Sequence, residues 1–273
     1  MKTACRPFRL VTIFGAAVFL RSVVAAARPS LFYGFSRSMT RVTIVQTGSV
    51  KPDLEPRHGT YPQMFERMLR SVSPDVAIDV VSVIDGERLP EPQAIEAAII
   101  TGSAYGVYDD IDWMEPLMDF IRKVYVAHKP MVGVCFGHQA IAQAMGGTVT
   151  KSEKGWGIGR HVYNVVEDNG LIAERDLAIA CSHQDQVVVP PPEARVFLSS
   201  EFTPYAGLLY GNGKVMSVQP HPEFTADYAL ALCESRRGIA PETLIEEAER
   251  SLDLPSDRAI LARAITQFLG AAD

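Results

Sequence analysis

A cysteine between two glycines constrains the fold of this 273-residue chain more than any other feature of its sequence. Residues 133–139 (GVCFGHQ) follow an apolar run at 130–132 and lead into residues 140–145, which have helical composition. The pattern Gly-x-Cys-x-Gly predicts a strand, a sharp turn and a helix, a nucleophile elbow with Cys135 at its corner. Such a corner strains the backbone, and flanking glycines lack the Cβ atoms that would clash there.

The predicted corner also favours a reactive thiol. We expect the sulfur of Cys135 at the N-terminus of the following helix, where the partial positive charge of the helix favours thiolate over thiol. The alternative is a small buried hydrophobic residue, which is the commoner fate of a free cysteine. The heptapeptide alone leaves both interpretations open, so partners elsewhere in the chain must decide between them.

The composition is that of an ordinary folded protein. Hydrophobic residues make up 47% and charged residues 21%, and the length suffices for one large domain or two small ones. The net charge of −6 argues against general nucleic-acid binding.

The cysteines are widely spaced, with no C-x-x-C pair, at Cys5, Cys135, Cys181 and Cys233. This spacing indicates neither a zinc site nor a disulfide framework, and we expect no metal and no cofactor. A reduced compartment is the natural setting for a working thiolate, so a cytoplasmic location is expected. Cys181 and Cys233 are interpreted as core residues.

The N-terminal segment 1–38 differs from the rest of the chain because it is basic and contains no acidic residue. Its apolar run at 10–20 is too short to span a membrane comfortably, and 25–27 (AAA) fits a small-residue cleavage site. It is a signal peptide, a transit peptide or an extension upstream of a native start at Met39, and we favour the last. In each case residues 39–273 form the folded domain and no stable membrane span is expected.

Strand and helix periods alternate along the first half of the folded region. Apolar, β-branched runs predict strands at 41–47, 76–83, 97–101 and 131–134. Amphipathic spacing predicts helices at 61–72 and 113–127. The alternation predicts an α/β fold with three αβα layers around a mixed, mostly parallel sheet. Ligands bind such sheets at the carboxyl ends of strands, where Gly102 and Cys135 are expected.

In the second half of the folded region, the predicted strands come first and the helices follow them. Short strands are predicted at 148–151, 160–166, 194–199, 205–210 and 214–218. Helices are predicted only near the C-terminus, at 224–235, 241–251 and 256–269. Residues 182–187 (SHQDQV) are interpreted as a polar turn between strands.

A second motif supplies the partners that a nucleophilic cysteine needs. Residues 219–224 (QPHPEF) follow the predicted strand 214–218, and two prolines stiffen the loop around His221. A cysteine nucleophile needs a base to take and return its proton, and the base needs a third group to fix its tautomer. His221 and Glu223 suit these roles, and both motifs fall at strand ends of one predicted sheet.

In this order, GVCFGHQ and QPHPEF resemble the motifs of the class I (triad) glutamine amidotransferases, over about residues 41–225. The resemblance implies a triad of Cys135, His221 and Glu223. It also implies thiolate attack on a γ-carboxamide, a γ-glutamyl thioester, ammonia release and hydrolysis. The loop 104–110 (AYGVYDD) narrows the resemblance to stand-alone members akin to the amidotransferase domain of GMP synthase, including plant γ-glutamyl peptidases.

The resemblance further implies an oxyanion hole. One donor is the backbone N–H of Phe136, the residue after the nucleophile. The other comes from Gly102 or Ser103, because this chain has Gly-Ser where family members usually carry two adjacent glycines. Taken alone, Gly102 is an ordinary glycine between a strand and a loop.

Substrate contacts are implied at five positions that the resemblance covers: Gln139, Ser182, His183, Trp156 and Gly157. Gln139 resembles the position that touches the substrate amide, and otherwise is a helix-surface glutamine. Ser182 and His183 match the family's Ser-His-x-Asp segment near the substrate. Trp156 and Gly157 border the pocket in the family, and otherwise belong to a flexible hairpin. His138 is expected to be structural.

Two outcomes share the implied chemistry. Ammonia from glutamine passes to a separate synthase subunit, or the chain acts alone on γ-glutamyl peptides. Only about fifty residues of helical sequence follow residue 225, so we expect any acceptor chemistry to need another chain. An alternative of another class is a non-catalytic regulatory binding module on the same fold. Such a module has no physical need for a strained cysteine corner, which favours an enzyme.

Overall fold

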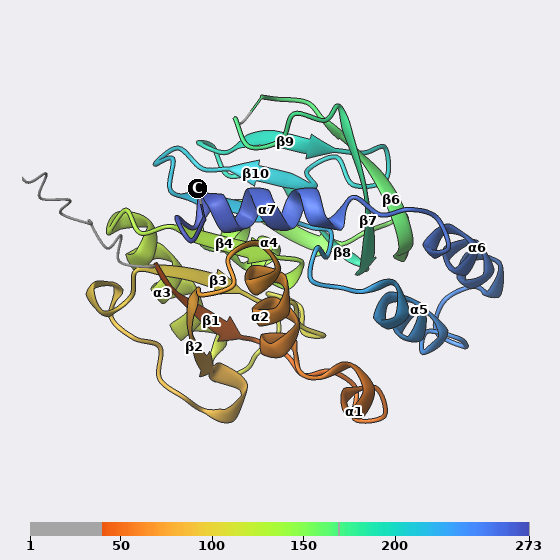
Figure 1. Cartoon of the computed structure of the whole chain (residues 1–273), viewed down its shortest axis with the longest axis horizontal. Coiled ribbons are helices and arrows are strands. Elements are labelled where there is room, and N and C mark those ends of the chain that lie inside the picture. The colour runs from red at the N-terminus through yellow and green to blue at the C-terminus, as the bar shows by residue number, and fades with distance from the viewer. Residues whose placement is uncertain (1–39, 169, 273) are drawn as a thin grey trace, which may run out of the picture. The chain divides into compact units, whose positions relative to one another are not determined.

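The computed structural model of the protein describes residues 40–168 and 170–272 (Figure 1). The predicted N-terminal extension, residues 1–38, lies outside the described residues. The strands are β1 (Arg41–Gln46), β2 (Ala77–Ser82), β3 (Ala97–Ile100), β4 (Met131–Val134), β5 (Thr148–Lys151), β6 (Gly157–Val165), β7 (Asp176–His183), β8 (Asp185–Val189), β9 (Arg195–Ser199), β10 (Gly207–Leu209) and β11 (Val215–Val218). The helices are α1 (Glu55–His58), α2 (Tyr61–Val72), α3 (Met114–Val126), α4 (Phe136–Ala144), α5 (Ala226–Glu234), α6 (Glu242–Leu252) and α7 (Arg258–Phe268), with short 3-10 turns η1 (Val83–Asp85) and η2 (Pro92–Ala94).

Within the described residues, nine strands form one mixed sheet in the order β2-β1-β3-β4-β11-β10-β9-β6-β7. The first five of these strands run parallel to one another. The other four are joined by antiparallel pairing, and β5 and β8 form a separate antiparallel pair. We call β2, β1, β3, β4 and β11 with α4 the parallel half. The antiparallel half comprises β10, β9, β6, β7, β5 and β8 with α5 and α6.

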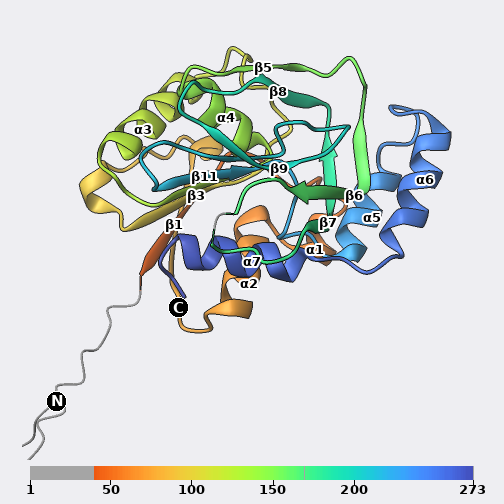
Figure 2. The same cartoon turned by 90° about the horizontal axis from the view of Figure 1, so that it is seen from above.

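The parallel strands are buried on both faces, which explains their continuous apolar sequences. In β1, Val42 and Ile44 pack in one cluster with side chains of α2 and α7, whereas Val45 packs in another with side chains of α3 and α4. Figure 2 shows the same division, with α2 and α7 on one face of the sheet and α3 and α4 on the other. These three layers confirm the predicted αβα fold.

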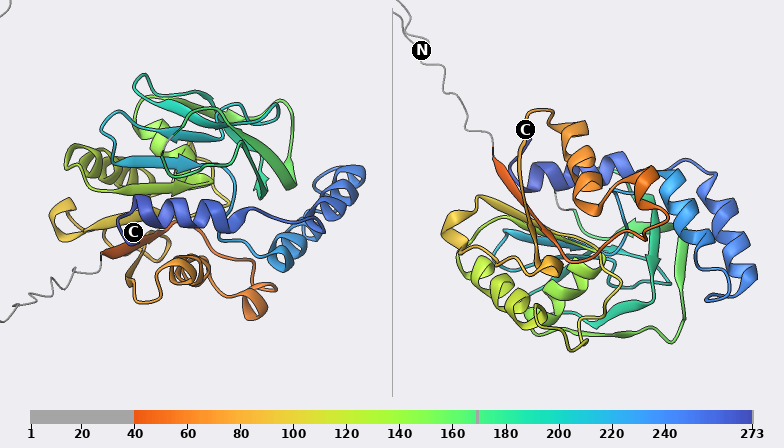
Figure 3. Two further views of the ribbon diagram at one scale, coloured as in Figure 1. Left: turned by 45° about the horizontal axis from the view of Figure 1, so that its top comes forward. Right: turned by 90° about the horizontal axis from the view of Figure 1, so that it is seen from below.

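The C-terminal helices α5 and α6 lie side by side at one end of the folded domain (Figure 3). They contact β6 and β7 of the antiparallel half. Ile245 and Ala248 of α6 are buried there with Ile158 of β6. This packing brings the turn between α5 and α6, although distant in sequence from the cysteine corner, to the side of the sheet where β6 begins.

The interpretation of residues 182–187 as a polar turn is wrong. The structure has β7 up to His183 and β8 from Asp185, so that only Gln184 separates two strands that the sequence analysis missed. The sequence of β7, DLAIACSH, is rich in small side chains, which gives a weak strand propensity. Pairing with β6 over eight residues determines the strand instead. No helix of the described residues is long and apolar enough to cross a membrane.

Candidate active site

Cys135 occupies the corner between β4 and α4. Its backbone angles, φ 53° and ψ −103°, are ones that residues with side chains rarely adopt. The corner is held from both sides, because the Cys135 N–H donates to the Val218 carbonyl of β11 at 2.9 Å and the Cys135 carbonyl accepts from the Gln139 N–H at 3.1 Å. The surrounding hydrogen bonds therefore fix the strained geometry.

The two glycines of the corner are sites of close backbone approach. A Cβ atom at Gly133 would overlap the carbonyl group of Gly137, and one at Gly137 would overlap the carbonyl oxygen of Ile100 in β3. The Gly137 N–H donates to the Thr101 carbonyl at 3.1 Å, which ties the first turn of α4 to the end of β3. Helix α4 can pack this closely against β3 and β4 only because Gly133 and Gly137 have no side chains.

His221 and Glu223 follow β11, the strand that lies parallel to β4 with Val218 opposite Val134. Residues that leave these two neighbouring strands therefore meet at one edge of the sheet. The His221 Nδ1 lies 2.7 Å from Oε1 of Glu223. The imidazole also stacks on the ring of Phe224, with 3.9 Å between ring centroids and 8° between planes. Both contacts limit the rotation of the imidazole.

Cys135, His221 and Glu223 are all buried, with at most 5% of each residue exposed. Burial by itself lowers the pKa of His221. The negative charges of Glu223 and Cys135, together with hydrogen bonds to both, outweigh burial and raise the pKa of His221 above its ordinary value. The arrangement favours a proton on His221, between a sulfur and a carboxylate.

Gly102 lies directly against this cluster. A Cβ atom at position 102 would lie 3.2 Å from Cε1 of His221 and 3.8 Å from Cβ of Cys135. Phe136 is the first residue of α4, and backbone N–H groups in the first turn of a helix have no partner within the helix. Ser103 is next along the loop, and its hydroxyl donates to the Thr47 carbonyl at 2.7 Å. The residues predicted to supply the oxyanion donors thus lie next to or near Cys135.

A cavity of about 300 Å³ opens at Cys135 and is lined from both halves of the protein. The parallel half contributes Cys135, Gln139 and the loop after β3. The antiparallel half contributes Trp156, Ser182, His183 and Asp185, among others. Four of the predicted substrate-contacting residues therefore line one cavity.

Gly157 is the exception among the predicted substrate contacts, because it does not line this cavity. It begins β6 opposite His183, and a Cβ atom at position 157 would lie 2.5 Å from the Phe202 ring and 3.0 Å from Nε2 of His183. Gly157 is thus a glycine of close packing behind the cavity. Its neighbour Trp156 lines the cavity. The sequence alone does not show which of these two adjacent residues faces the cavity.

The amide of Gln139 is buried and joins the two halves, so Gln139 is not a helix-surface residue. Its Nε2 donates to the Asp185 carbonyl at 2.9 Å and to Oε1 of Gln219 at 3.2 Å. His183 is equally buried, with Nδ1 3.1 Å from the Asp185 carbonyl. Burial, and then the charge of His161, lower the pKa of His183 to about 3, so it is neutral near pH 7. The Ser182 hydroxyl is buried without a hydrogen-bond partner among the described residues.

Cys181, Cys233 and His138 lie outside the cavity. Cys181 and Cys233 are buried free cysteines, as predicted, and burial raises the pKa of both, to about 12 for Cys181. His138 is fully buried on α4 with Nδ1 2.7 Å from the Ser217 hydroxyl, and burial lowers its pKa to about 3. Within the part of the chain that the structure describes, no group of His, Cys, Asp or Glu is arranged to hold a metal ion.

Two cationic residues of the cavity, Lys151 and Arg236, were missed by the sequence analysis. Lys151 ends β5, and Arg236 lies in the turn between α5 and α6. Neither belongs to a motif that carries the family resemblance. The docking of α5 and α6 on β6 and β7 brings Arg236 to the cavity, and no local sequence pattern signals that contact.

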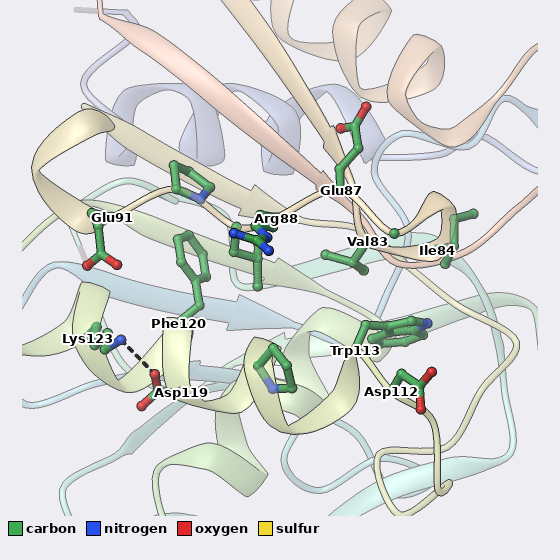
Figure 4. A pocket seen from close by; sticks show the side chains of 14 residues that line it. Val83, Ile84, Glu87, Arg88, Glu91, Asp112, Trp113, Asp119, Phe120 and Lys123 are labelled. Atoms are coloured by element: carbon green, nitrogen blue, oxygen red, sulfur yellow. Dashed lines mark ion pairs between the residues drawn. The ribbon is translucent and has the colours of Figure 1, made fainter.

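A second cavity, of about 560 Å³, lies between residues 83–91 and α3 (Figure 4). Trp113 and Phe120 line it, and Lys123 pairs with Asp119 at its rim at 2.8 Å. It is larger than the cavity at Cys135. However, its described lining includes no cysteine and no histidine, so the candidate chemistry belongs to the smaller cavity.

Comparison with known proteins agrees with this geometry. The model of the family "Glutamine amidotransferase class-I" matches residues 58–229. This chain belongs to the class I glutamine amidotransferase family. Relatives in the wider family include γ-glutamyl peptidase 2 of Arabidopsis thaliana, 30% identical over 185 residues that cover 64% of this chain and 73% of that protein. One component of the glutamine-hydrolysing GMP synthase of Sulfolobus acidocaldarius is 28% identical over 150 residues, which cover 54% of this chain and 78% of that component.

A solved structure shows the same family fold. The glutamine amidotransferase of Thermotoga maritima superimposes with a TM-score of 0.66 at 22% sequence identity, over 85% of this chain and 98% of that chain. The predicted fold class and family are therefore confirmed. The matched residues of the family model end at 229, so Arg236 and the α5–α6 turn lie outside them.

Proposed function

We propose that this protein hydrolyses the γ-amide bond of glutamine or of a γ-glutamyl peptide through a thioester on Cys135. The observation that carries the proposal is the arrangement of three buried groups, of which Cys135 lines the cavity. Cys135 stands on a strained corner near His221, since a Cβ atom at Gly102 would contact both, and Nδ1 of His221 lies 2.7 Å from the Glu223 carboxylate. This is the arrangement of an activated nucleophile, its base and the group that orients the base.

In the first half of the reaction, the thiolate of Cys135 attacks the γ-carbonyl carbon and the carbonyl oxygen becomes an oxyanion. The backbone N–H of Phe136 and that of Gly102 or Ser103 stabilise this charge. Collapse of the intermediate breaks the C–N bond. His221 gives its proton to the departing nitrogen, which leaves as ammonia or an amine, and the γ-glutamyl group remains on sulfur.

In the second half, water replaces the amine. His221, now neutral, takes a proton from the water as its oxygen attacks the thioester carbonyl. The C–S bond breaks, glutamate leaves, and the proton stays on His221 beside the regenerated thiolate. Glu223 holds the imidazole in one tautomer through both halves, and stabilises its charged form.

The relatives support two versions of this reaction. γ-Glutamyl peptidases are named for action on γ-glutamyl peptides, and the Sulfolobus relative is one component of a glutamine-hydrolysing synthase. In the first version the chain works alone on a peptide. In the second it hydrolyses glutamine for a separate synthase subunit, which receives the ammonia.

The test is incubation of the purified chain with glutamine and with γ-glutamylglycine in parallel, with detection of glutamate. Cys135→Ala should abolish release from either substrate, and acid quenching of the wild type should trap one γ-glutamyl group on the peptide that contains Cys135. Cys181→Ala is the matched control, because Cys181 is a buried cysteine outside the cavity. Glutamate release by Cys135→Ala at the wild-type rate would refute the proposal.

The same assay separates the two versions. Turnover of γ-glutamylglycine by the isolated chain selects the peptidase. Glutamine turnover that remains slow until a synthase subunit is added selects the amidotransferase. Turnover of neither substrate, with slow alkylation of Cys135, would instead support a non-catalytic module.

A further inference from the structure

Arg236 is a charged side chain at the candidate active site, and no carboxylate of the described residues forms an ion pair with it. It is partly buried and lines the cavity that opens at Cys135, and its buried Nε has no hydrogen-bond partner in the part of the chain that the structure describes. Its neighbour Arg237 is different, because it pairs with Glu242 and Glu249 of α6. The two adjacent arginines of one turn thus have distinct surroundings, and only Arg236 belongs to the cavity.

The position of Arg236 is fixed by its contacts. Its guanidinium lies over the ring of Trp156, 4.4 Å from the centroid, in a cation–π contact. Its backbone carbonyl accepts from the N–H groups of Ile239 and Ala240 at 2.9 and 3.0 Å, which closes the turn between α5 and α6. A guanidinium held in this way loses little rotational freedom when it binds a planar anion.

The carboxylates that line the same cavity are satisfied by other groups. Asp185 accepts from the Tyr108 hydroxyl at 2.8 Å, and Asp109 accepts from the Gly106 N–H at 2.9 Å. No ion pair joins either carboxylate to Arg236 among the described residues. Burial lowers the pKa of Arg236, although the negative charge of Cys135 opposes that shift. An anion from outside the protein would balance a charge that burial disfavours.

We propose that Arg236 binds the α-carboxylate of the γ-glutamyl substrate and makes a free α-carboxylate a requirement of this site. The assignment rests on the proposed function, because it takes a γ-glutamyl carbonyl at Cys135 as its starting point. Glutamine and every γ-glutamyl peptide carry this carboxylate at the opposite end of the same side chain. A guanidinium matches a carboxylate with two parallel hydrogen bonds, so Arg236 acts as a specificity residue rather than as a catalytic residue.

A binding experiment tests this assignment without requiring turnover. Iodoacetamide alkylation of Cys135 is followed in the presence of L-glutamate or of isoglutamine, which carries an α-amide in place of the α-carboxylate. In the wild type, glutamate should protect Cys135 at a concentration about 10- to 100-fold lower than isoglutamine, the range expected for a charged hydrogen bond. Arg236→Met should remove this difference, and Arg236→Lys should retain part of it.

Arg237→Met is the matched control, since Arg237 is the adjacent arginine and is paired with α6 rather than exposed to the cavity. In this variant, protection by glutamate should match that in the wild type. The charges of Arg236 and Cys135 interact, so the rate of alkylation without ligand is measured for each variant and protection is expressed relative to it. A preference for glutamate over isoglutamine that survives in Arg236→Met would overturn the assignment.

Hydrolysis kinetics give a second readout. With glutamine or γ-glutamylglycine as substrate, Arg236→Met should raise KM about 10- to 100-fold with a small change in kcat, because the contact is made equally in ground and transition states. The α-amide of glutamine should be as poor a substrate for the wild type as glutamine is for the variant. γ-Glutamylglycinamide lacks the carboxylate of the leaving glycine and keeps the α-carboxylate. If the wild type discriminates against this compound and Arg236→Met does not, Arg236 binds the leaving group and the assignment is wrong.

These results distinguish the two proposals. A wild type that hydrolyses no γ-glutamyl compound, but whose Cys135 is protected by glutamate through Arg236, would overturn the proposed function and retain the carboxylate site. A wild type that hydrolyses γ-glutamylglycine with no dependence on Arg236 would do the reverse.

Discussion

The two halves of the sheet contribute to the candidate active site in different ways. In the parallel half, backbone geometry places the reactive groups: Cys135 stands at the end of β4, and His221 follows the adjacent strand β11. In the antiparallel half, the cavity is lined by side chains such as Trp156 and Arg236, which are brought in by tertiary packing. In the first arrangement each reactive group lies within a few residues of a strand end and strand pairing brings the groups together, whereas the second depends on how whole helices dock on the sheet.

Because of this difference, substitutions in the two halves should have different effects. Chemistry depends on a corner and a loop that tolerate little alteration, because their glycines and hydrogen bonds leave no space. Specificity depends on side chains that can be exchanged while the sheet stays intact. We therefore expect substitutions in the parallel half to affect kcat and folding, and those in the antiparallel half to affect KM.

The largest effect is expected at Glu223. Glu223→Gln keeps the size of the side chain but removes the charge that holds the His221 tautomer and raises its pKa. We expect kcat to fall on the order of 10³- to 10⁴-fold, as in other triads whose orienting carboxylate becomes an amide. Glu193→Gln is the control, because Glu193 contacts the Tyr125 hydroxyl and does not line the cavity. Similar kcat values for the two variants would contradict the proposed role of Glu223.

The next effect is on folding. Gly137→Ala places a methyl group against the Ile100 carbonyl, so we expect the free energy of unfolding to fall by about 3 kcal/mol. Gly213, in the hairpin between β10 and β11, is a contrasting control with open space around it and a φ of +68°. Gly213→Ala should cost only about 1 kcal/mol, from backbone strain alone. Urea unfolding of both variants measures the difference, and equal losses would mean that the corner is not tightly packed.

The sequence predicts the parallel half more completely than the antiparallel half for a physical reason. The parallel strands are continuous apolar runs buried on both faces, and the reactive groups lie within a few residues of strand ends. β7 was missed because small and polar side chains dilute its strand pattern, so that pairing rather than propensity determines it. β8 was missed because its first residues belong to the segment interpreted as a polar turn, although three of its five residues are valines. Arg236 was missed because its contact with Trp156 depends on how α5 and α6 dock, which no local pattern encodes.

A third effect compares the cysteines of the two halves. Cys135 lines a cavity, whereas Cys181 of β7 and Cys233 of α5 are packed in the core, where burial raises the pKa of each thiol. Near neutral pH we expect iodoacetamide to label Cys135 at least about 100-fold faster than either, because only the thiolate reacts. Mass spectrometry of separate peptides follows the three rates. Equal and slow labelling would remove the support for a nucleophile at the corner.

The smallest effect involves two neutral histidines, one in each half. Burial lowers the pKa of His138 on α4 and of His183 on β7 to about 3, against 6.5 for the unfolded chain. Below pH 6.5 the unfolded chain therefore gains protons that the folded chain does not bind, and stability falls as the pH falls. At pH 5 each residue should cost about 2 kcal/mol relative to neutral pH.

His138→Asn and His183→Asn test whether this acid sensitivity is shared equally between the halves. Urea unfolding at pH 7 and pH 5 should show that each variant loses about 2 kcal/mol less than the wild type over this interval. The comparison uses the change with pH, so a uniform destabilisation by either substitution does not affect it. A variant that loses as much stability as the wild type between pH 7 and pH 5 would mean that the substituted histidine is not held neutral in the folded chain.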